Sequence, residues 1–496
     1  MSRAQNLKLS RKWHLLLVWP AMLSVLIYVL SSLAHPVAGW VGPEKQRFKA
    51  PSFQVGGKAV NSIASIIQRH QLTSAQIAKL VPYDNQILLQ ITQGSGPNLI
   101  RRYFSTDSYN ELPEQDAKQA IWLAQQYVIG NPKVKFVEYI NEFNETYPES
   151  NRLLPVYKIH YQGASHLTAV VHTESLALVS LNNDAKRFIK SVFRMFHTFD
   201  WLSEYEALRL TVIGFLLLVM LMMSVTGFYF LLVMKRKRVI KKAQRRWHQR
   251  LSYVLVLPLF LFSVSGFYHL FQASFYSPKE LVVSQTQLNL SQWQKPIVIT
   301  KEIAGLSLSQ VSLVQSDGPL YRLQVVKKGR HGHGMPMQKV AAQKRVHFLN
   351  AHTGQALEYS DSVLIKEALA KRFSLDKTNL ANSTMLHAFE QGYSFKNKRL
   401  PVWRIELQDE GNHHVFIDPV TQTLLASNNP VTRLEGYSFS YLHMWGFLKP
   451  LVGHLGRDVT FTIVLVLIFA LGLLGLLVHL KAKRRVKGAA GVLQRV

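Results

Sequence analysis

The sequence contains no cysteine. This absence excludes disulfide bridges, iron–sulfur clusters, thiolate catalysis and c-type haem attachment, so any bound metal must rest on His, Met, Tyr or carboxylate ligands. Acidic residues are also few, because 58 Lys and Arg stand against 29 Asp and Glu. The chain has no glycine-rich dinucleotide fingerprint after a strand, no phosphate-binding loop and no Ser-His-Asp signature. No motif therefore indicates a nucleotide-dependent or hydrolytic enzyme.

Long apolar runs are the most prominent feature that is present. Four stretches contain almost only apolar and small residues, at roughly 13–34, 209–234, 250–272 and 459–480. Each is near the ~20 residues that a helix needs to cross the ~30 Å hydrocarbon core of a bilayer. The intervening segments 35–208 and 273–458 have the polarity, turn residues and aromatics of folded soluble domains. We therefore predict a membrane protein with four transmembrane α-helices and two large extramembrane domains.

The apolar runs carry two further indications. The first run is too long for a removed signal peptide and lacks a small-residue cleavage site, so we expect it to remain as an anchor. None of the four runs contains a charged residue past its first position. Ion-coupled transporters usually bury such residues within their helices, so the sequence argues against transport.

The basic residues predict the orientation in the membrane. Residues 235–250, KRKRVIKKAQRRWHQR, contain nine Lys and Arg and no acidic residue, and the segments 1–12 and 481–496 are also basic and acid-free. The positive-inside rule places these segments, including the loop 235–249, in the cytoplasm. We therefore expect a multi-pass membrane protein with both termini cytoplasmic and both large domains facing outward, into the periplasm if the source is Gram-negative. Much of the positive net charge of the chain is then explained by its orientation in the lipid membrane. We therefore expect no nucleic acid as a partner.

The chain repeats itself. An offset of 234 residues relates two pairs of histidines, which are His14 with His248 and His35 with His269. An offset of 246 relates later positions, which are LPVYKI (154–159) with LPVWRI (400–405), Asn182–Asn183 with Asn428–Asn429, and His197 with His443. Each half reads as helix, outside domain, helix. The pattern predicts an internal duplication whose halves are related by an axis along the membrane normal.

The outside domains have an α+β pattern. Residues 114–129 and 360–373 have helical spacing of apolar residues, and Asn131–Pro132 stops the first of these runs. Alternating segments follow each helix, among them KVKFVEYINEF and PVYKIHY in the first half and VWRIELQ in the second. We therefore expect a helix followed by a small antiparallel sheet in each half.

With these features the chain resembles the PepSY-associated transmembrane proteins. The resemblance rests on helices that open with Trp-His, on the PepSY-type helix-plus-sheet pattern, and on LHMWGFLKPLVGHLGRD at 442–458. That family includes iron-regulated inner-membrane proteins and ferric-siderophore reductases that carry b-type haem. The resemblance implies two PepSY-like periplasmic domains, an oxidoreductase activity, haem b as cofactor and a ferric siderophore or other metal complex as substrate. It also favours His197 and His443 as ligands.

The histidines are candidate haem ligands on physical grounds too. At ~1.5 Å per residue, the step from His14 to His35 covers ~31 Å and places the two imidazoles at opposite membrane faces. In a duplicated bundle His14 can face His248 near the cytoplasm, while His35 can face His269 near the outside. Two opposed imidazoles suit the axial positions of a haem iron, and a haem near each face would form an electron path.

The sequence leaves alternatives open for the histidine ligands. His197 and His443 compete with His35 and His269 for the outer site, and pairing within one half competes with pairing across the axis. Histidine at a membrane interface can also be a simple amphipathic anchor. The cytoplasmic segments are too short to fold a flavin or nicotinamide domain, so a quinol or a separate reductase would have to deliver electrons.

One loop has a different character. The segment KKGRHGHGMPMQKV (327–340) sets soft and imidazole ligands at alternate positions, which are His331, His333, Met335 and Met337. Such ligands suit Cu(I), although the same composition also occurs in flexible surface loops. The sequence thus predicts an inner-membrane b-haem protein that reduces ferric complexes. The alternatives are a non-catalytic PepSY sensor or peptidase regulator and a copper-handling reductase.

Overall fold

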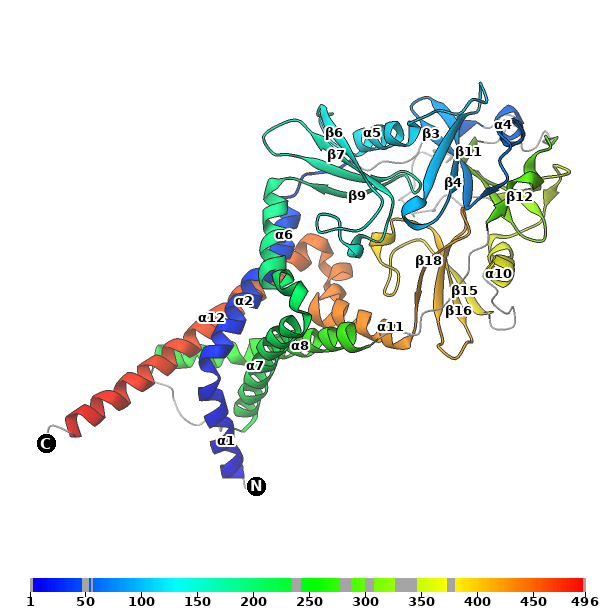
Figure 1. The fold of residues 1–496 in the computed structure, drawn as a ribbon. Coiled ribbons are helices and arrows are strands. Elements are labelled where there is room, and N and C mark those ends of the chain that lie inside the picture. The colour runs from blue at the N-terminus through cyan, green and yellow to red at the C-terminus, as the bar shows by residue number, and fades with distance from the viewer. Residues whose placement is uncertain are drawn as a thin grey trace, which may run out of the picture. The chain divides into compact units, whose positions relative to one another are not determined.

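A computed structural model describes the chain over the segments 3–46, 53–54, 57–233, 242–276, 287–298, 307–325, 346–372 and 380–493. The chain divides into two compact units, each assembled from segments that are far apart in sequence. The membrane unit consists of Met1–Gly42, Asp184–Pro278 and Val431–Val496, and the extramembrane unit consists of Pro43–Asn183 and Lys279–Pro430. Figure 1 shows the chain, with many of the elements of both units labelled.

The membrane unit is helical. Its elements are α1 (Arg3–Leu16), α2 (Val18–Ser32), α3 (Ala34–Trp40), α6 (Asp184–Phe196), η3 (Asp200–Tyr205), α7 (Glu206–Val233), α8 (Ala243–Phe275), α11 (Pro430–Tyr437), the π-helix η7 (Ser438–His443), η8 (Gly446–Leu448) and α12 (Lys449–Leu493). Among the described residues, four helical stretches are long and apolar enough to cross a membrane, which are Val18–Trp40, Asp184–Val233, Ala243–Phe275 and Gly446–Ala482. The structure therefore agrees with the prediction of a membrane protein with four spanning helices.

The helix bounds differ from the apolar runs of the sequence. The helix predicted at 250–272 is α8, which begins at Ala243, and the one predicted at 459–480 is α12, which extends to Leu493. Basic flanks continue a helix because Lys and Arg are good helix formers whose long side chains reach water. The unit boundary differs as well. The segments 184–208 and 431–458, which we assigned to the outside domains, belong to the membrane unit, where α6 packs on α2 and α3.

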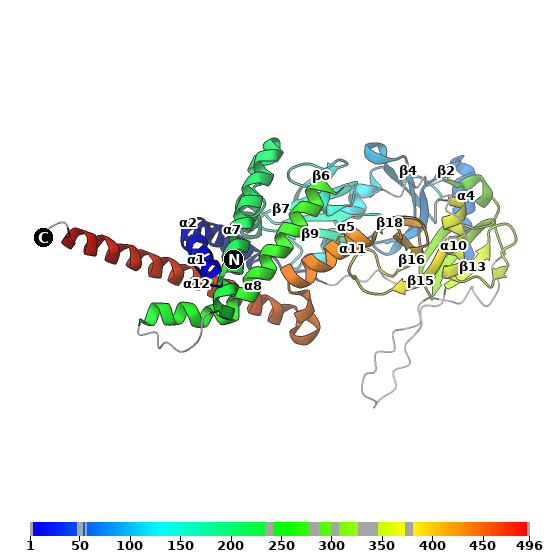
Figure 2. The ribbon, with the colours of Figure 1, turned by 90° about the horizontal axis from the view of Figure 1, so that it is seen from below.

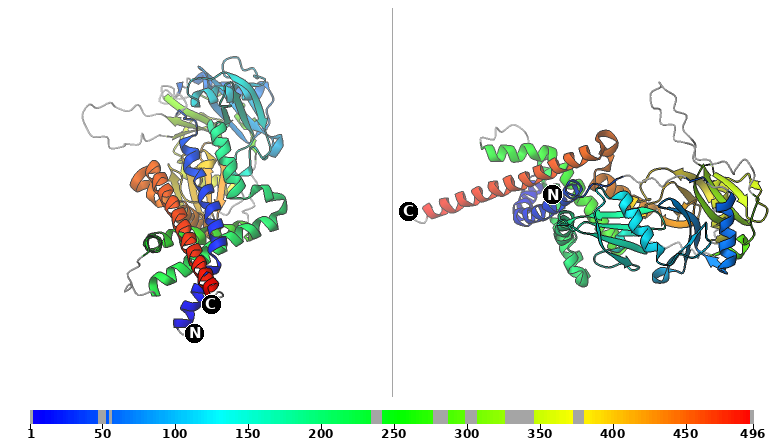
Figure 3. Two further views of the ribbon diagram at one scale, coloured as in Figure 1. Left: turned by 90° about the vertical axis from the view of Figure 1, so that its left-hand side faces the viewer. Right: turned by 90° about the horizontal axis from the view of Figure 1, so that it is seen from above.

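The spanning helices pack through an apolar interior with small polar residues between them. Helix α7 packs on α8 and α2, and α12 packs on α8 and α2; Figures 2 and 3 show these helices from other sides. The interior includes Tyr28, Leu217, Leu255 and Leu465, one from each of the four helices. Buried serines on α2, α7 and α8 donate their hydroxyl protons to carbonyls of the preceding turn. Small side chains satisfied in this way let neighbouring helices approach closely.

One sheet of the extramembrane unit is shared by both halves of the chain. Its strands follow the order β14-β13-β12-β11-β3-β4-β5, with β1 paired to β11. The strands are β1 (Phe53–Gln54), β3 (Ile77–Tyr83), β4 (Gln86–Gln93), β5 (Ile100–Ser105), β11 (Ser307–Gln315), β12 (Pro319–Val325), β13 (Val346–Asn350) and β14 (Ala356–Leu357). At the junction of the halves, Val311 of β11 lies opposite Leu80 of β3.

This shared sheet corrects the expectation of two separate extramembrane domains at 35–208 and 273–458. In a separate first domain β3 would be an edge strand with an unpaired row of backbone groups. Pairing with β11 satisfies those groups and removes the edge. Residues from both halves consequently share one apolar core, which includes Ile63, Leu89 and Phe104 from the first half and Val311 and Tyr321 from the second.

Each half also has a helix followed by a four-stranded antiparallel sheet, as the sequence predicted. Helix α5 (Gln115–Tyr127) and helix α10 (Asp361–Arg372) precede these sheets. The strands in the two sheets are β6 (Val134–Ile140), β7 (Val156–Tyr161), β8 (Thr168–His172) and β9 (Ala177–Asn182), then β15 (Leu380–Leu386), β16 (Val402–Leu407), β17 (His414–Asp418) and β18 (Thr423–Asn428). Apolar residues of each helix, such as Ala124 and Leu369, pack against its sheet.

Shorter elements complete the extramembrane unit. They are α4 (Gly57–Arg69), β2 (Ser74–Ala75), η1 (Gly96–Asn98), η2 (Glu149–Asn151), β10 (Leu288–Asn289), η4 (Leu290–Trp293) and η6 (Phe395–Asn397). Local details recur at the offset of 246. Arg152 after η2 and Lys398 after η6 both have left-handed backbone, with φ of 68° and 59°. The hydroxyls of Tyr147 and Tyr393 each donate to the carbonyl six residues later.

Candidate functional site

The histidines predicted as ligands lie on helices of the membrane unit or directly beside them. Their positions are His14 on α1, His35 on α3, His197 just after α6, His248 and His269 on α8, and His443 at the end of η7. The helical path from His14 to Ser31 and the path from His248 to Ser265 have the same length, about 25 Å at ~1.5 Å per residue. Both serines contact histidines, as described below. The histidines therefore form an inner pair and an outer cluster.

The inner pair consists of His14 and His248. Nδ1 of His14 lies 3.0 Å from the hydroxyl oxygen of Thr226, which donates its own proton to the Met222 carbonyl 2.9 Å away. Nδ1 of His248 lies 3.2 Å from the Leu471 carbonyl, which can only accept. These partners assign the proton of each ring to Nδ1, so Nε2 of each ring carries the lone pair. The two rings are close enough to interact electrostatically.

A glycine makes room for one of these rings. A Cβ added at Gly475 of α12 would lie 3.0 Å from Cε1 of His248, closer than most real contacts. Glycine at this position therefore lets α12 approach the imidazole without a clash.

The outer cluster repeats the same hydrogen-bonding arrangement. Nδ1 of His197 lies 3.0 Å from the hydroxyl of Ser31, and Nδ1 of His443 lies 3.2 Å from that of Ser265. Both serines donate their own protons to carbonyls of the preceding turn, at 3.3 and 2.7 Å, so each accepts from its histidine. The lone pair is again on Nε2. All four rings thus have the same tautomer.

The structure brings the rings of His197 and His443 into contact. Their ring centroids are 6.3 Å apart, with an angle of 76° between the ring planes. An iron held between two imidazoles by bonds of about 2 Å separates the ring centroids by roughly 6 Å. The spacing and the shared tautomer therefore fit two axial ligands of one haem.

His35 and His269 lie farther out. In each half a phenylalanine ring separates two histidine rings, in the order His35–Phe193–His197 and His269–Phe439–His443. The centroid distances are 4.9 and 4.6 Å in the first half and 4.7 and 5.1 Å in the second. The His269 side chain is 47% exposed and pairs with Glu435. The duplication argument suggested that His35 faces His269. The structure differs, because each of the two packs on the phenylalanine of its own half.

Sequence reasoning did not predict that serine and phenylalanine side chains support these histidines, although a signal existed. Ser31 and Ser265 are related by the offset of 234, and Phe193 and Phe439 by the offset of 246. Applying the offsets to small polar and aromatic residues would have found them. The loop residues His331, His333, Met335 and Met337 lie outside the residues that the structure describes. Within the described residues, no group of three or more His, Asp or Glu side chains could hold a metal ion.

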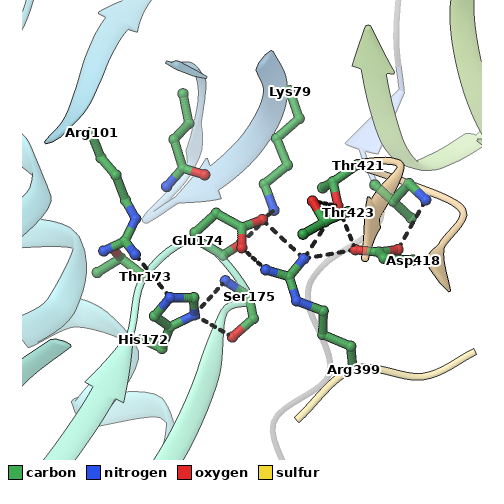
Figure 4. A network of polar contacts seen from close by, with 12 residues as sticks. Lys79, Arg101, His172, Thr173, Glu174, Ser175, Arg399, Asp418, Thr421 and Thr423 are labelled. Carbon is green, nitrogen blue, oxygen red and sulfur yellow. Dashed lines mark hydrogen bonds and ion pairs between the residues drawn. The ribbon is translucent and has the colours of Figure 1, made fainter. Parts of the chain in front are cut away.

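The extramembrane unit buries a network of charges (Figure 4). Lys79 of β3 is 3% exposed, and its Nζ lies 2.6 Å from a carboxylate oxygen of Glu174. Arg399 pairs with Glu174 and, at 2.7 Å, with Asp418. Burial lowers the pKa of Lys79 to about 7, and Arg399 adds to the effect. Burial alone would raise the pKa of Asp418, but Arg399, the backbone N–H of Val420 and Lys79 together lower it.

A second part of the network surrounds His172. Nη2 of Arg101 donates to Nε2 of His172 over 2.8 Å, and Nη1 donates to the Thr173 hydroxyl over 3.1 Å. Burial and then Arg101 lower the pKa of His172 well below its ordinary value. Nδ1 of His172 lies 2.8 Å from the Ser175 hydroxyl. This is not a hydrolytic site, because the guanidinium occupies the nitrogen that a general base would need free.

Comparison with known proteins places the chain in a family. A family model described as the PepSY-associated TM region matches residues 15–360, which is more than half of the chain. The chain belongs to this family of PepSY-associated transmembrane proteins. A search of curated proteins finds no match.

Proposed function

We propose that this protein is a b-haem electron carrier of the bacterial inner membrane that reduces ferric complexes, including ferric siderophores, on the periplasmic side. The observation that carries the proposal is the His197–His443 pair, with ring centroids 6.3 Å apart and both Nδ1 atoms bonded to serine hydroxyls. A second haem at His14 and His248 is supported by the same tautomer and by Gly475, which lets α12 pack against the His248 ring.

Each residue has a defined part in this proposal. The serine and threonine hydroxyls and the Leu471 carbonyl hold the imidazoles in one orientation and keep Nε2 free to ligate iron. The helix interior excludes water and favours the neutral imidazoles over charged ones. A haem bound at each layer supplies one-electron transfer, and the layers lie about 25 Å apart along α8. Phe193 and Phe439 extend the aromatic contacts beyond the outer pair.

The finer assignments of topology belong to the same proposal. The basic, acid-free segment 235–250 supports a cytoplasmic loop between the second and third spanning helices. The recurring offsets support an internal duplication, and the helix-plus-sheet of each half is the periplasmic PepSY-like part. Electrons would enter from a quinol or a separate reductase. Reduction releases the metal because the hard oxygen ligands of siderophores prefer Fe(III) to Fe(II).

The test is a dithionite-minus-air absorption spectrum of the purified full-length protein, with haem quantified by pyridine haemochrome. We expect the spectrum of low-spin, six-coordinate b-type haem and two haems per chain. Ferric siderophore added to the reduced protein should re-oxidise it. A folded but colourless protein would contradict the proposal and leave the sensor or peptidase-regulator function.

The copper alternative has its own test. Replacing His331, His333, Met335 and Met337 together should leave haem content and ferric reduction largely unchanged, because thioether sulfurs contribute little to binding hard Fe(III). Loss of re-oxidation in this variant, with normal behaviour of His197 and His443 variants, would favour the copper-handling reductase.

A further inference from the structure

The extramembrane unit contains an open pocket where elements of the two repeats meet. Its volume is about 510 Å³, within the range of small-molecule sites. The lining residues come from the segment between β6 and β7 and from β18, and they are Phe143, Glu149, Ser150, Arg152 and Leu425. Because β6, β7 and β18 belong to different four-stranded sheets, the pocket exists only when both repeats are folded together.

Basic residues of the second repeat extend the charge of this pocket. The elements η2 and η6 contact each other, and Nη1 of Arg152 donates to the side-chain oxygen of Asn397 over 3.3 Å. Lys396 and Lys398 flank Asn397 on either side. Arg152 and Lys398 occupy equivalent, left-handed positions of the two repeats. Two cationic side chains are therefore held in corresponding places around the contact between η2 and η6.

These cations form a cluster of like charge. In the part of the chain that the structure describes, no carboxylate forms an ion pair with Lys45, Arg152, Lys396 or Lys398. Burial, followed by repulsion from Lys45 and Lys396, lowers the pKa of Lys398 to about 8. Burial and Arg152 lower the pKa of Lys396. Mutually repelling, partly buried cations are stabilised by an anionic ligand, and Glu149 is the one acidic residue of the pocket lining.

Aromatic rings accompany the cations. Phe143 in the pocket lining is 38% exposed, and Phe395 on η6 is 60% exposed. Nζ of Lys398 lies 5.1 Å from the centroid of the Phe395 ring. Exposed rings beside ammonium and guanidinium groups offer both stacking and charge to a ligand that is aromatic and anionic.

We propose that this pocket, which we call the repeat-contact pocket, binds a compact anionic metal chelate with aromatic ligands, such as a tris-catecholate complex of a trivalent metal. The inference rests on the proposed function, because such a ferric complex would be a substrate for reduction. A chelate of this class presents negative charge to Arg152, Lys396 and Lys398 and flat ring faces to Phe143 and Phe395. Neutral chelates match the pocket less well, because they leave the cations uncompensated.

The experiment uses the redox-inert tris-catecholate complex of Ga(III), titrated calorimetrically into the full-length protein. We expect saturable binding that weakens as salt is raised. The double variant Arg152→Ala/Lys398→Ala should bind at least ten-fold more weakly, whereas the matched control Lys118→Ala on α5 should bind like wild type. Glu149→Gln should bind two- to five-fold more tightly, because it removes a negative charge from the lining.

Two further measurements separate the outcomes. A neutral tris-hydroxamate complex of Ga(III) should bind at least ten-fold more weakly than the catecholate. Leu425 lines the pocket from the other repeat. Leu425→Trp should weaken binding and leave the thermal unfolding temperature unchanged. This variant keeps the test valid if the double variant fails to fold. Equal affinity of wild type and the double variant, or no binding by wild type, would overturn the inference. Haem content is measured independently. A haem-containing protein that does not bind the chelate contradicts the proposed pocket but not the proposed function. A colourless protein that binds the chelate contradicts electron transfer but not the pocket.

Discussion

The two units of this protein bury polar groups in opposite ways. In the membrane unit the polar groups of the candidate site are imidazoles, each with Nδ1 bonded to a hydroxyl or carbonyl, which assigns the lone pair to Nε2. In the extramembrane unit charged side chains are buried in pairs, as with Lys79 and Glu174 or Arg322 and Asp361. The imidazoles of the membrane unit therefore keep a nitrogen that can bind a metal, whereas the ion pairs of the extramembrane unit use their polar atoms on each other.

This difference distinguishes a ligand site from a structural network. A fully paired buried cation has no remaining capacity for a ligand, and removing its partner destabilises the fold. A buried imidazole that uses only one nitrogen keeps the other for a metal, and removing it affects the cofactor more than the fold. We therefore expect the two kinds of group to respond differently to substitution.

The largest effect should come from the outer histidines. His197→Ala or His443→Ala should each remove the same haem, halving the haem content, because a six-coordinate site needs both ligands. Pyridine haemochrome and the reduced absorption spectrum measure the loss. His35→Ala is the matched control and should keep both haems, since His35 packs outside Phe193. Loss of haem in the His35 variant alone would reverse our assignment of the outer ligands.

The next effect concerns the charges of the extramembrane unit. Arg322, 2% exposed, pairs with both carboxylate oxygens of Asp361 at 2.8 and 2.9 Å. Asp361→Asn should lower the free energy of unfolding by about 3–5 kcal/mol, because a buried guanidinium loses its counter-charge. Denaturant unfolding followed by tryptophan fluorescence measures this change.

The exposed pair of Arg404 and Glu390 supplies the control for that measurement. Glu390→Gln should cost no more than about 1 kcal/mol. Haem content should be unchanged in both variants. If Asp361→Asn lost haem but kept its stability, the contrast between the units would be wrong.

A smaller effect should appear as a dependence on pH. The pKa of buried His172 lies well below its ordinary value of 6.5. Between those two pKa values the unfolded chain binds a proton that the folded chain does not, so stability is complete above pH 6.5 and falls as pH drops below it. The loss is at most about 1.4 kcal/mol per pH unit for one proton. Unfolding midpoints at pH 7.5 and 5.5 measure the slope, and His172→Gln should reduce it; an unchanged slope in that variant would assign the effect to other groups.

The smallest effect should come from the serines that orient the outer imidazoles. Ser31→Ala or Ser265→Ala removes the acceptor of an Nδ1–H group but leaves Nε2 in place. We expect haem to be retained and its midpoint potential to change, since the hydrogen bond tunes the basicity of the ligand. Redox titration measures the change, with Ser263→Ala, whose hydroxyl bonds only within α8, as the control. Identical potentials in all three variants would show that the serines do not tune the site.

Several features could be read from the sequence because they depend on local pattern. Apolar length predicts the spanning helices, helical and alternating periodicity predicts α5 and the strands after it, and fixed offsets predict an internal duplication. The candidate ligands His14 and His248 followed from the same offsets. These properties are encoded by residues close together in the chain, or by residues at constant intervals along it.

Other features were decided only by the tertiary structure. The pairing of β3 with β11 merges two expected domains, and it depends on edges that the sequence does not mark. Lys79, Arg101 and Arg399 read as ordinary basic residues until the fold buries them against acids from distant segments. The choice of His197 and His443 over His35 and His269 as the close pair also belongs here. Short-range pattern sets which helices and strands form, whereas long-range packing chooses among chemically equivalent side chains. The imidazoles of His197 and His443 come together only when α6 and η7 have docked on the spanning helices.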